Sequence, residues 1–205
     1  FNVKQDSFYF SAVDCTGHGV PGAFMSIVGY NHLNQSLEKP NVTAASLIDG
    51  LNRGVSQTLH MASEGYTVKD GMDIALCAVD MKKRKLQFAG AYNPLYLIRG
   101  KEFIEIKADK FPIGSYVEDP RDYTNHEMDI QNGDTFYIFT DGYADQFGGP
   151  QGKKFMYKKF RDLLISIQDK SMKEQGVILE EAMEEWKKNT AQIDDILVIG
   201  FRINF

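Results

Sequence analysis

The chain has 205 residues, about a third more than the usual domain of about 150, so we expect one large domain rather than two. Hydrophobic residues make up 43% and charged residues 25% of the sequence, which excludes a disordered, collagen-like or coiled-coil chain. The net charge of -5 provides no basic field for nucleic acid, and no apolar run approaches the roughly 18 residues of a membrane-spanning helix.

The first residues and the cysteines suggest where the chain works. The segment that starts at Phe1 has neither an initiating methionine nor the apolar stretch of a signal peptide, so we expect a piece of a longer polypeptide. Cys15 and Cys77 show neither a disulfide framework nor a paired metal spacing, which fits a reducing compartment. We therefore expect a cytoplasmic domain without direct membrane insertion, even if the parent protein is tethered to a membrane.

The N-terminal third of the chain is predicted to form one strand and two helices. A strand at residues 8–15 delivers Asp14 to a Gly-rich turn. Helices follow at about residues 20–37 and about 43–61, the second with Thr43 as its N-cap. The residues expected to face the core are Phe24, Ile27, Val28 and Leu33 in the first helix and Leu47, Ile48, Leu51, Val55 and Leu59 in the second.

After Gly71 the apolar period changes from helical to two, which predicts strands at about 73–81, 85–91, 95–99 and 103–107. Their short connections make them antiparallel. The basic cluster at residues 82–85 is interpreted as a hairpin tip rather than a nucleic-acid patch. A further hairpin is expected from strands at 121–130 and 134–140, joined by the turn that contains Asn132-Gly133.

The C-terminal part is predicted to contain helices at 155–168 and about 173–189, followed by a closing strand at 196–203. The apolar positions of these helices are Phe160, Leu163, Leu164, Ile167, Val177, Leu179, Met183 and Trp186. Runs of strands alternate with pairs of helices, so the fold class is α+β, with antiparallel sheets packed against helical hairpins.

Carboxylates stand at three comparable places, each next to the end of a predicted strand. They are Asp14, Asp141 and the pair Asp194-Asp195. Three carboxylates brought together without neutralisation would repel one another, so they either lie apart as ordinary loop residues or hold a hard cation. Without converging histidine or cysteine, such a set favours Mg²⁺ or Mn²⁺ over zinc or copper.

Other chemistries are conceivable at the turn after Asp14. Residues 17–22 match G-x-G-x-x-G, but one helix leads to another helix here, so a dinucleotide site is rejected. A thiolate nucleophile at Cys15 lacks the arginine expected of an anion-binding loop, and Cys77 lies in an apolar strand. His18 is either a proton donor to a leaving group or a structural hydrogen-bonding residue of the turn.

A series of short motifs carries a resemblance to a known family. Residues 12–23, which include Asp14-Cys15-Thr16-Gly17, resemble its first metal motif. Further matches are Ala89-Gly90-Ala91-Tyr92-Asn93-Pro94, Phe111-Pro112-Ile113-Gly114, Thr140-Asp141-Gly142 and Asp194-Asp195, in the order of the family. On these motifs the chain resembles the SpoIIE-like branch of the metal-dependent 2C-type (PPM) serine/threonine protein phosphatases, over nearly its whole length.

The resemblance implies a single phosphatase domain over residues 1–205, with two stacked antiparallel sheets flanked by helical hairpins. It implies a binuclear Mn²⁺ or Mg²⁺ site in which Asp14 bridges both metals, the Cys15 carbonyl is a ligand, and Asp141 and Asp194 complete one metal. A metal-activated water would then attack the phosphoester in line. These residues, Asp14, Asp141 and Asp194, are the expected catalytic set.

Departures from the family pattern affect the second metal and the neighbouring residues. Family members carry a Gly-Gly-Asp-Phe/Tyr-Tyr strand upstream, whose aspartate serves the second metal; this sequence starts after it, so we expect that N-terminal strand to be missing and one site to be incomplete. Tyr92 replaces a histidine, so no catalytic role is assigned there. Asp73 lies where the sheet should approach the metals; a water-mediated or substrate-side role is a candidate there, and its role is left open.

The resemblance also implies partners. The expected substrate is a phosphorylated anti-sigma-factor antagonist of the STAS type, or a similar bacterial signalling protein. The first two helices resemble a regulatory pair through which an upstream sensor domain acts on metal binding and dimerisation, so a homodimer is one expected state. The alternatives are a pseudophosphatase that docks the phosphoprotein without hydrolysing it, and a domain that metal only stabilises.

Overall fold

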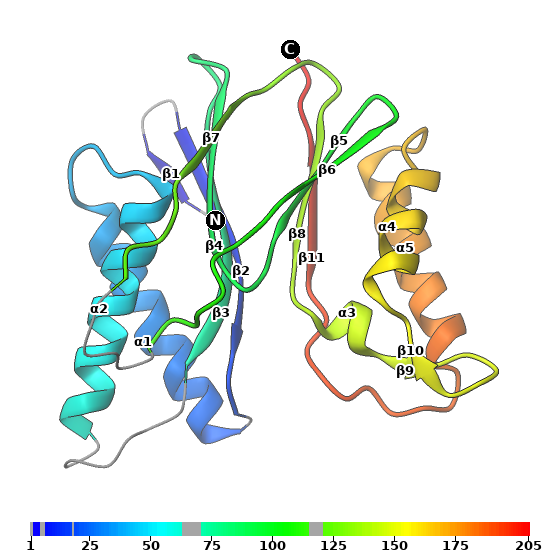
Figure 1. The fold of residues 1–205 in the computed structure, drawn as a ribbon, viewed down its shortest axis with the longest axis horizontal. Coiled ribbons are helices and arrows are strands. Elements are labelled where there is room, and N and C mark those ends of the chain that lie inside the picture. Colours follow the sequence, from blue (N-terminus) through cyan, green and yellow to red (C-terminus); the bar gives the residue numbers. More distant parts are fainter. Residues whose placement is uncertain (1, 5–6, 18, 63–70, 115–120) are drawn as a thin grey trace. The chain divides into compact units, whose positions relative to one another are not determined.

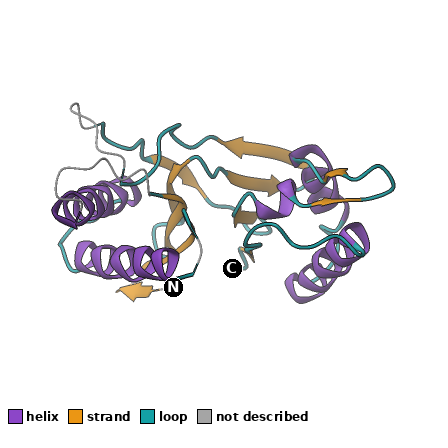
Figure 2. Ribbon diagram, turned by 90° about the horizontal axis from the view of Figure 1, so that it is seen from below, coloured by secondary structure: helices purple, strands orange, loops and turns teal. Residues whose placement is uncertain are grey.

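The computed structural model describes residues 2–4, 7–17, 19–62, 71–114 and 121–205. The chain divides into two compact units, residues 1–95 with 106–130 and residues 96–105 with 131–205. Each unit contains an antiparallel sheet and helices (Figures 1 and 2), so the α+β class with antiparallel sheets is confirmed. None of the helices within these described ranges is long and apolar enough to cross a membrane.

The first unit carries a five-stranded sheet in the order β1-β2-β3-β4-β7. Its strands are β1 (Asn2–Lys4), β2 (Ser7–Cys15), β3 (Met72–Asp80), β4 (Lys85–Ala91) and β7 (His126–Asp129). Each neighbouring pair runs antiparallel. Residues 81–84 form the turn between β3 and β4, so the basic cluster does lie at a hairpin tip as predicted.

Helices α1 (Val20–Leu37) and α2 (Ala44–Ala62) pack with this sheet around the core of the first unit, and they run side by side in Figure 2. The predicted apolar stripe of α2 is buried throughout, and alternate residues of β3 join it. Thr43 is the N-cap as predicted, since its Oγ1 accepts a hydrogen bond of 3.1 Å from the backbone N–H of Ser46. The buried residues are Leu47, Ile48, Leu51, Val55 and Leu59 of α2, with Met72, Ile74 and Leu76 of β3.

The helix α1 has the predicted bounds but turns a different face to the core. Val28 is buried, whereas Phe24 and Ile27 are 48% and 60% exposed. The helix packs mainly along α2, where a Cβ at Gly54 would come within 2.3 Å of the His32 ring, so glycine permits the close approach. Apolar side chains occur all around α1, and for that reason the sequence pattern does not select its buried face.

The second unit carries a four-stranded sheet in the order β11-β8-β5-β6. The strands are β5 (Leu95–Arg99), β6 (Glu102–Ile106), β8 (Thr135–Phe139) and β11 (Val198–Arg202). A short helix α3 (Gly142–Asp145) follows β8, and the small strands β9 (Phe147–Gly148) and β10 (Lys153–Lys154) follow it. Helices α4 (Tyr157–Ser166) and α5 (Met172–Lys187) pack with this sheet through an aromatic-rich core.

The hairpin predicted around Asn132-Gly133 is wrong. The strand β7 covers only His126–Asp129 and pairs with β4, whereas β8 pairs with β5 and β11. Residues 121–125 leave the sheet because they bond to α2: the Tyr123 N–H donates to Asp49, and the Asn125 side chain accepts from the Ala45 N–H. The Asn-Gly turn itself is present, with Gly133 at φ 88°, but it joins strands that belong to different sheets.

The C-terminal helices are shorter than predicted, and the short elements α3, β9 and β10 were missed. Residues 155 and 156 precede α4, and α5 ends at Lys187. Val177, expected on the apolar stripe of α5, is 47% exposed, whereas Leu179 and Met183 are buried. The four residues of α3 are too few to show a helical period, so the sequence pattern gave no signal for them.

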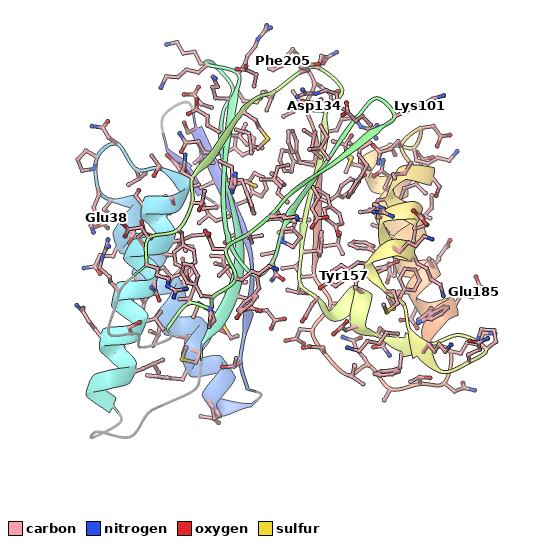
Figure 3. The ribbon with its side chains drawn as sticks, in the orientation of Figure 1. Glu38, Lys101, Asp134, Tyr157, Glu185 and Phe205 are labelled. Atoms are coloured by element: carbon pink, nitrogen blue, oxygen red, sulfur yellow. The ribbon has the colours of Figure 1, made fainter. Side chains whose placement is uncertain are left out.

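An ion pair between neighbouring strands stabilises the second unit. Asp134, labelled in Figure 3 just before β8, is 1% exposed, and its two carboxylate oxygens accept from Arg99 Nε at 2.8 Å and from a terminal guanidinium nitrogen at 2.7 Å. The same carboxylate accepts from the Gln131 N–H at 2.8 Å. Such a bidentate pair is among the stronger polar interactions, and removal of one partner leaves the other charge poorly compensated.

We predict that Asp134→Ala lowers the free energy of unfolding by about 3 kcal/mol, because Arg99 and the Gln131 N–H lose their acceptor. Urea unfolding at neutral pH measures the change. The matched control is Asp169→Ala in the same unit, whose carboxylate pairs with Lys170 at 3.0 Å but is 70% exposed; it should leave stability nearly unchanged. Equal effects of the two substitutions would contradict this account of the ion pair.

Candidate metal centre

Asp14 lies near the end of β2, on the face of the sheet that points away from α1 and α2. Its chain neighbours Val13 and Cys15 both pack against the helix-side core, and side chains alternate along a strand. Directly opposite Asp14 in the register stands Asp73 of β3. Residues opposite each other share a face, with Cβ atoms about 4.5–5.5 Å apart, so two carboxylates meet at this end of the sheet.

The turn after Asp14 is fixed to the start of β3. The Thr16 hydroxyl accepts from the Gly71 N–H at 2.8 Å and lies 3.1 Å from the Gly71 carbonyl oxygen, and the Thr16 N–H donates to that oxygen at 2.9 Å. Further along, a Cβ at Gly22 would come within 2.8 Å of the Gly17 carbonyl oxygen, so the chain folds back closely there. The Gly-rich stretch thus shapes a tight turn into α1 rather than a dinucleotide loop, as the antiparallel topology also requires.

The thiols of the chain are poorly suited to nucleophilic catalysis. Burial raises the pKa of the Cys15 thiol, and the negative charge of Asp14 adds to that effect, although a hydrogen bond from Ser26 opposes it. Cys77 is fully buried in β3, and burial raises its pKa further. Both cysteines therefore stay protonated near neutral pH, in agreement with the rejection of a thiolate mechanism.

In the second unit, Asp141 and Asp194 come together from distant parts of the chain. Asp141 follows the fully buried strand β8 and caps the start of α3, and Asp194 lies in the loop before β11. An oxygen atom of each carboxylate lies within 4.8 Å of the other. Burial raises the pKa of Asp141, as do the charges of Asp194 and Asp145, while Lys154 lowers it. Ionising Asp141 beside Asp194 is thus costly unless a cation is present.

The residues on either side of Asp141 fix the loop that carries Asp194. The Thr140 hydroxyl donates to the Asp195 carbonyl at 2.8 Å and accepts from the Leu197 N–H at 3.0 Å. A Cβ at Gly142 would lie 2.4 Å from the Asp195 carbonyl oxygen, so only glycine allows this approach. The Thr-Asp-Gly sequence therefore fixes the backbone of the Asp194 loop at Asp195, on the side that leads into β11.

The helix α3 is anchored in the core, so its position is well defined. Tyr143 is 2% exposed, stacks on Phe160 with ring centroids 4.5 Å apart, and donates to the Leu179 carbonyl at 2.8 Å. At the end of α3, Asp145 forms an ion pair with Lys154 at 2.7 Å. Asp145 gave no signal in the sequence, because an acidic residue in a short helix has no distinguishing pattern.

The expected site residues thus divide between the two units. Asp14 and the Cys15 carbonyl belong to the first unit, and Asp141 and Asp194 belong to the second, where the structure brings those two carboxylates together. His18 lies outside the described residues. The donors are carboxylate oxygens, which suit a hard cation such as Mg²⁺ or Mn²⁺.

Comparisons with known proteins agree with this fold. The family model for Stage II sporulation protein E (SpoIIE) matches residues 4–204. The SiaA-PP2C domain of Pseudomonas aeruginosa is 31% identical with a TM-score of 0.89, over 99% of this chain and 78% of that one. No curated protein matches the chain.

Two more distant structures share the fold. The PP2C phosphatase domain of SpoIIE from Bacillus subtilis, solved with a fragment of its regulatory domain, is 17% identical with a TM-score of 0.68, over 99% of this chain and 58% of that one. RsbX in complex with magnesium is 14% identical with a TM-score of 0.66, over 97% of this chain and 82% of that one. On the family match over nearly its whole length and its likeness to the SiaA domain, the chain belongs to the SpoIIE family and has the fold of PP2C phosphatase domains.

Proposed function

We propose that this chain is a Mn²⁺- or Mg²⁺-dependent phosphatase that removes phosphate from phosphoserine or phosphothreonine of a signalling protein. Membership of the SpoIIE family supports a PP2C-type phosphatase domain. The observation that carries the proposal is the pair Asp141 and Asp194. Their carboxylate oxygens lie within 4.8 Å of each other, and their negative charges repel each other. We propose further that residues 1–205 act as one catalytic domain.

The ligand set that we propose is the one expected from the sequence. Asp141 and Asp194 fit a hard cation by donor type and spacing. Asp14 and the Cys15 carbonyl would complete the set, because they stand in the stretch that resembles the first metal motif of the family. The magnesium of the RsbX structure supports Mg²⁺ beside Mn²⁺ as the ion. When bound, a divalent cation supplies Lewis-acid chemistry, polarising phosphoryl oxygens and making water a better nucleophile.

No side chain needs to become phosphorylated in this proposal. Water forms the new bond to phosphorus, the bond to the serine or threonine oxygen breaks, and that oxygen gains a proton. The high pKa of the Cys15 thiol and its packing on the helix side of the sheet support a mechanism without a cysteine nucleophile. The chain's own carboxylates would hold the ion and fix its place.

The proposed partners are a phosphorylated STAS-type protein as substrate and an upstream regulatory domain, both in the cytoplasm. The helix α1 supports a protein partner, since it exposes large apolar side chains. They are Val20, Phe24, Ile27 and Tyr30, which are 83%, 48%, 60% and 70% exposed. Apolar residues gathered along one exposed helix are typical of an interaction surface. We propose that the regulatory domain contacts α1.

We predict that Mn²⁺-dependent phosphate release from a serine-phosphorylated STAS-domain protein falls by about a hundredfold or more in Asp14→Asn and Asp141→Asn, because each loses a metal ligand. Cys15→Ser is the matched control and should keep nearly full activity. Loss of activity in Cys15→Ser with retention in Asp141→Asn would contradict the metal mechanism. Mn²⁺ binding without turnover by the wild-type protein would instead favour a docking module.

A second prediction follows from the raised pKa of Asp141. This carboxyl ionises less readily in the folded than in the unfolded protein, so its contribution to stability is lost as pH rises from about 3.8 through its raised pKa. Without divalent cation at pH 7, Asp141→Asn should therefore melt at a higher temperature than wild type, and the difference should shrink as pH falls toward 4. Added Mn²⁺ should stabilise wild type more than the variant.

Thermal melts with a chelator and with Mn²⁺ measure both effects. Asp169→Asn, which changes an exposed carboxylate of the same unit, controls for the loss of one negative charge. If Asp141→Asn melts at a lower temperature than wild type at pH 7 without metal, the ionised Asp141 carboxylate does not destabilise the fold, and the prediction is wrong.

A further inference from the structure

Gln146 directly follows α3 and is completely buried, at 0% exposure. Its side-chain amide makes three hydrogen bonds. Nε2 donates to the Ala191 carbonyl at 2.9 Å and to the Phe147 carbonyl at 3.0 Å, and Oε1 accepts from the Ile193 N–H at 3.3 Å. Two of these three partners lie in the segment immediately before Asp194.

The backbone of Gln146 is itself held from several sides. Its N–H donates to the Gly142 carbonyl at 3.1 Å, and its carbonyl accepts from the Phe155 N–H at 3.0 Å and from Trp186 Nε1 at 3.1 Å. The amide therefore projects from a fixed point. That point is one end of α3, and Asp141 caps the other end, where its carbonyl accepts from the Asp145 N–H at 2.9 Å.

The loop that carries Asp194 is thus held by hydrogen bonds on both sides of Asp194. Thr140 binds the backbone after it, at Asp195 and Leu197, and Gln146 binds the backbone before it, at Ala191 and Ile193. Residues 191–195 are exposed and belong to no helix or strand. Within the loop, the Asp194 carbonyl accepts from Gln192 Nε2 at 2.8 Å, and the Asp194 carboxylate accepts from the Asp195 N–H at 2.8 Å. A carboxylate on an exposed loop loses conformational freedom when it binds an ion, and a loop fixed beforehand reduces that cost.

We propose that Gln146 is a positioning residue that holds the Asp194 loop at the spacing to Asp141 required for metal binding. This inference rests on the proposed function. An amide suits both contacts, because its Nε2 donates to the Ala191 carbonyl and its Oε1 accepts from the Ile193 N–H. An ionised glutamate offers acceptors only, and an apolar side chain offers neither.

The test compares Gln146→Met with Gln175→Met. Methionine nearly keeps the length of glutamine but forms none of the amide's hydrogen bonds. Gln175 is also a buried glutamine of the second unit, 1% exposed, but its side chain bonds to the Tyr137 hydroxyl and the Lys170 carbonyl and not to the Asp194 loop. A purely structural role would make both variants lose thermal stability while Mn²⁺ affinity stays the same.

We expect Gln146→Met to weaken Mn²⁺ binding about tenfold or more in calorimetric titration without substrate, and Gln175→Met to leave it unchanged. At saturating Mn²⁺ the kcat of Gln146→Met should approach that of wild type, because the ligands themselves remain. Unchanged Mn²⁺ affinity in Gln146→Met would overturn the inference. If Gln146→Met does not fold, Gln146→Asn carries the same test, since its shorter amide does not reach both partners.

Hydrogen exchange separates this inference from the proposed function. In metal-free protein, the amides of residues 192–196 should exchange faster in Gln146→Met than in wild type or Gln175→Met. Unchanged exchange there would overturn the positioning role. Wild-type protein that binds no Mn²⁺ would contradict the proposed metal function. If the loop amides still exchange faster in Gln146→Met, the conclusion that Gln146 fixes the loop remains valid.

Discussion

The carboxylates of Asp141 and Asp194 approach within 4.8 Å, and partial burial of Asp141 weakens the screening that water would provide. Because two like charges repel each other at this spacing, the surrounding structure must hold the carboxylates there. The second unit does this with ordinary means. A buried strand carries Asp141 to its end, and backbone hydrogen bonds fasten the Asp194 loop on both sides.

The stability that permits this arrangement comes from elsewhere in the unit. The core beneath α3 is rich in aromatic side chains, and Tyr143 joins α3 to it by stacking on Phe160 and by a hydrogen bond to Leu179. Aromatic pairs of this kind contribute more than their buried area alone. The repulsion at the site is therefore a local cost that the packing of the unit offsets, and a bound cation would outweigh it by attracting both carboxylates.

The helices of the first unit and the acidic residues of the site were largely predictable from the sequence. The helix α2 has a single apolar face and a clear N-cap, so the sequence pattern predicted both the bounds of the helix and its buried face. The α1 pattern gave the bounds only, because apolar residues on several faces leave the packing side undetermined. Asp141 and Asp194 stood out because each is an acidic residue next to a strand end.

Other features depended on contacts between residues far apart in the chain. The Asn-Gly turn predicted a hairpin, yet Tyr123 and Asn125 bond to α2 and the two strands join different sheets. Gln146 gave no signal at all, since its role depends on the backbone of residues more than forty positions later. Local patterns identify elements and ligand types, whereas long-range hydrogen bonds decide pairing and positioning.

The central proposal is that Asp14 and Asp194 serve one metal centre. Counting the Mn²⁺ ions bound to wild type, Asp14→Asn, Asp194→Asn and the double variant, by electron paramagnetic resonance at fixed free Mn²⁺, tests it most directly. The account predicts that both single variants lose bound Mn²⁺ and that the double variant binds no less than Asp14→Asn alone. A full complement of Mn²⁺ in Asp14→Asn, or a further loss in the double variant, would contradict it.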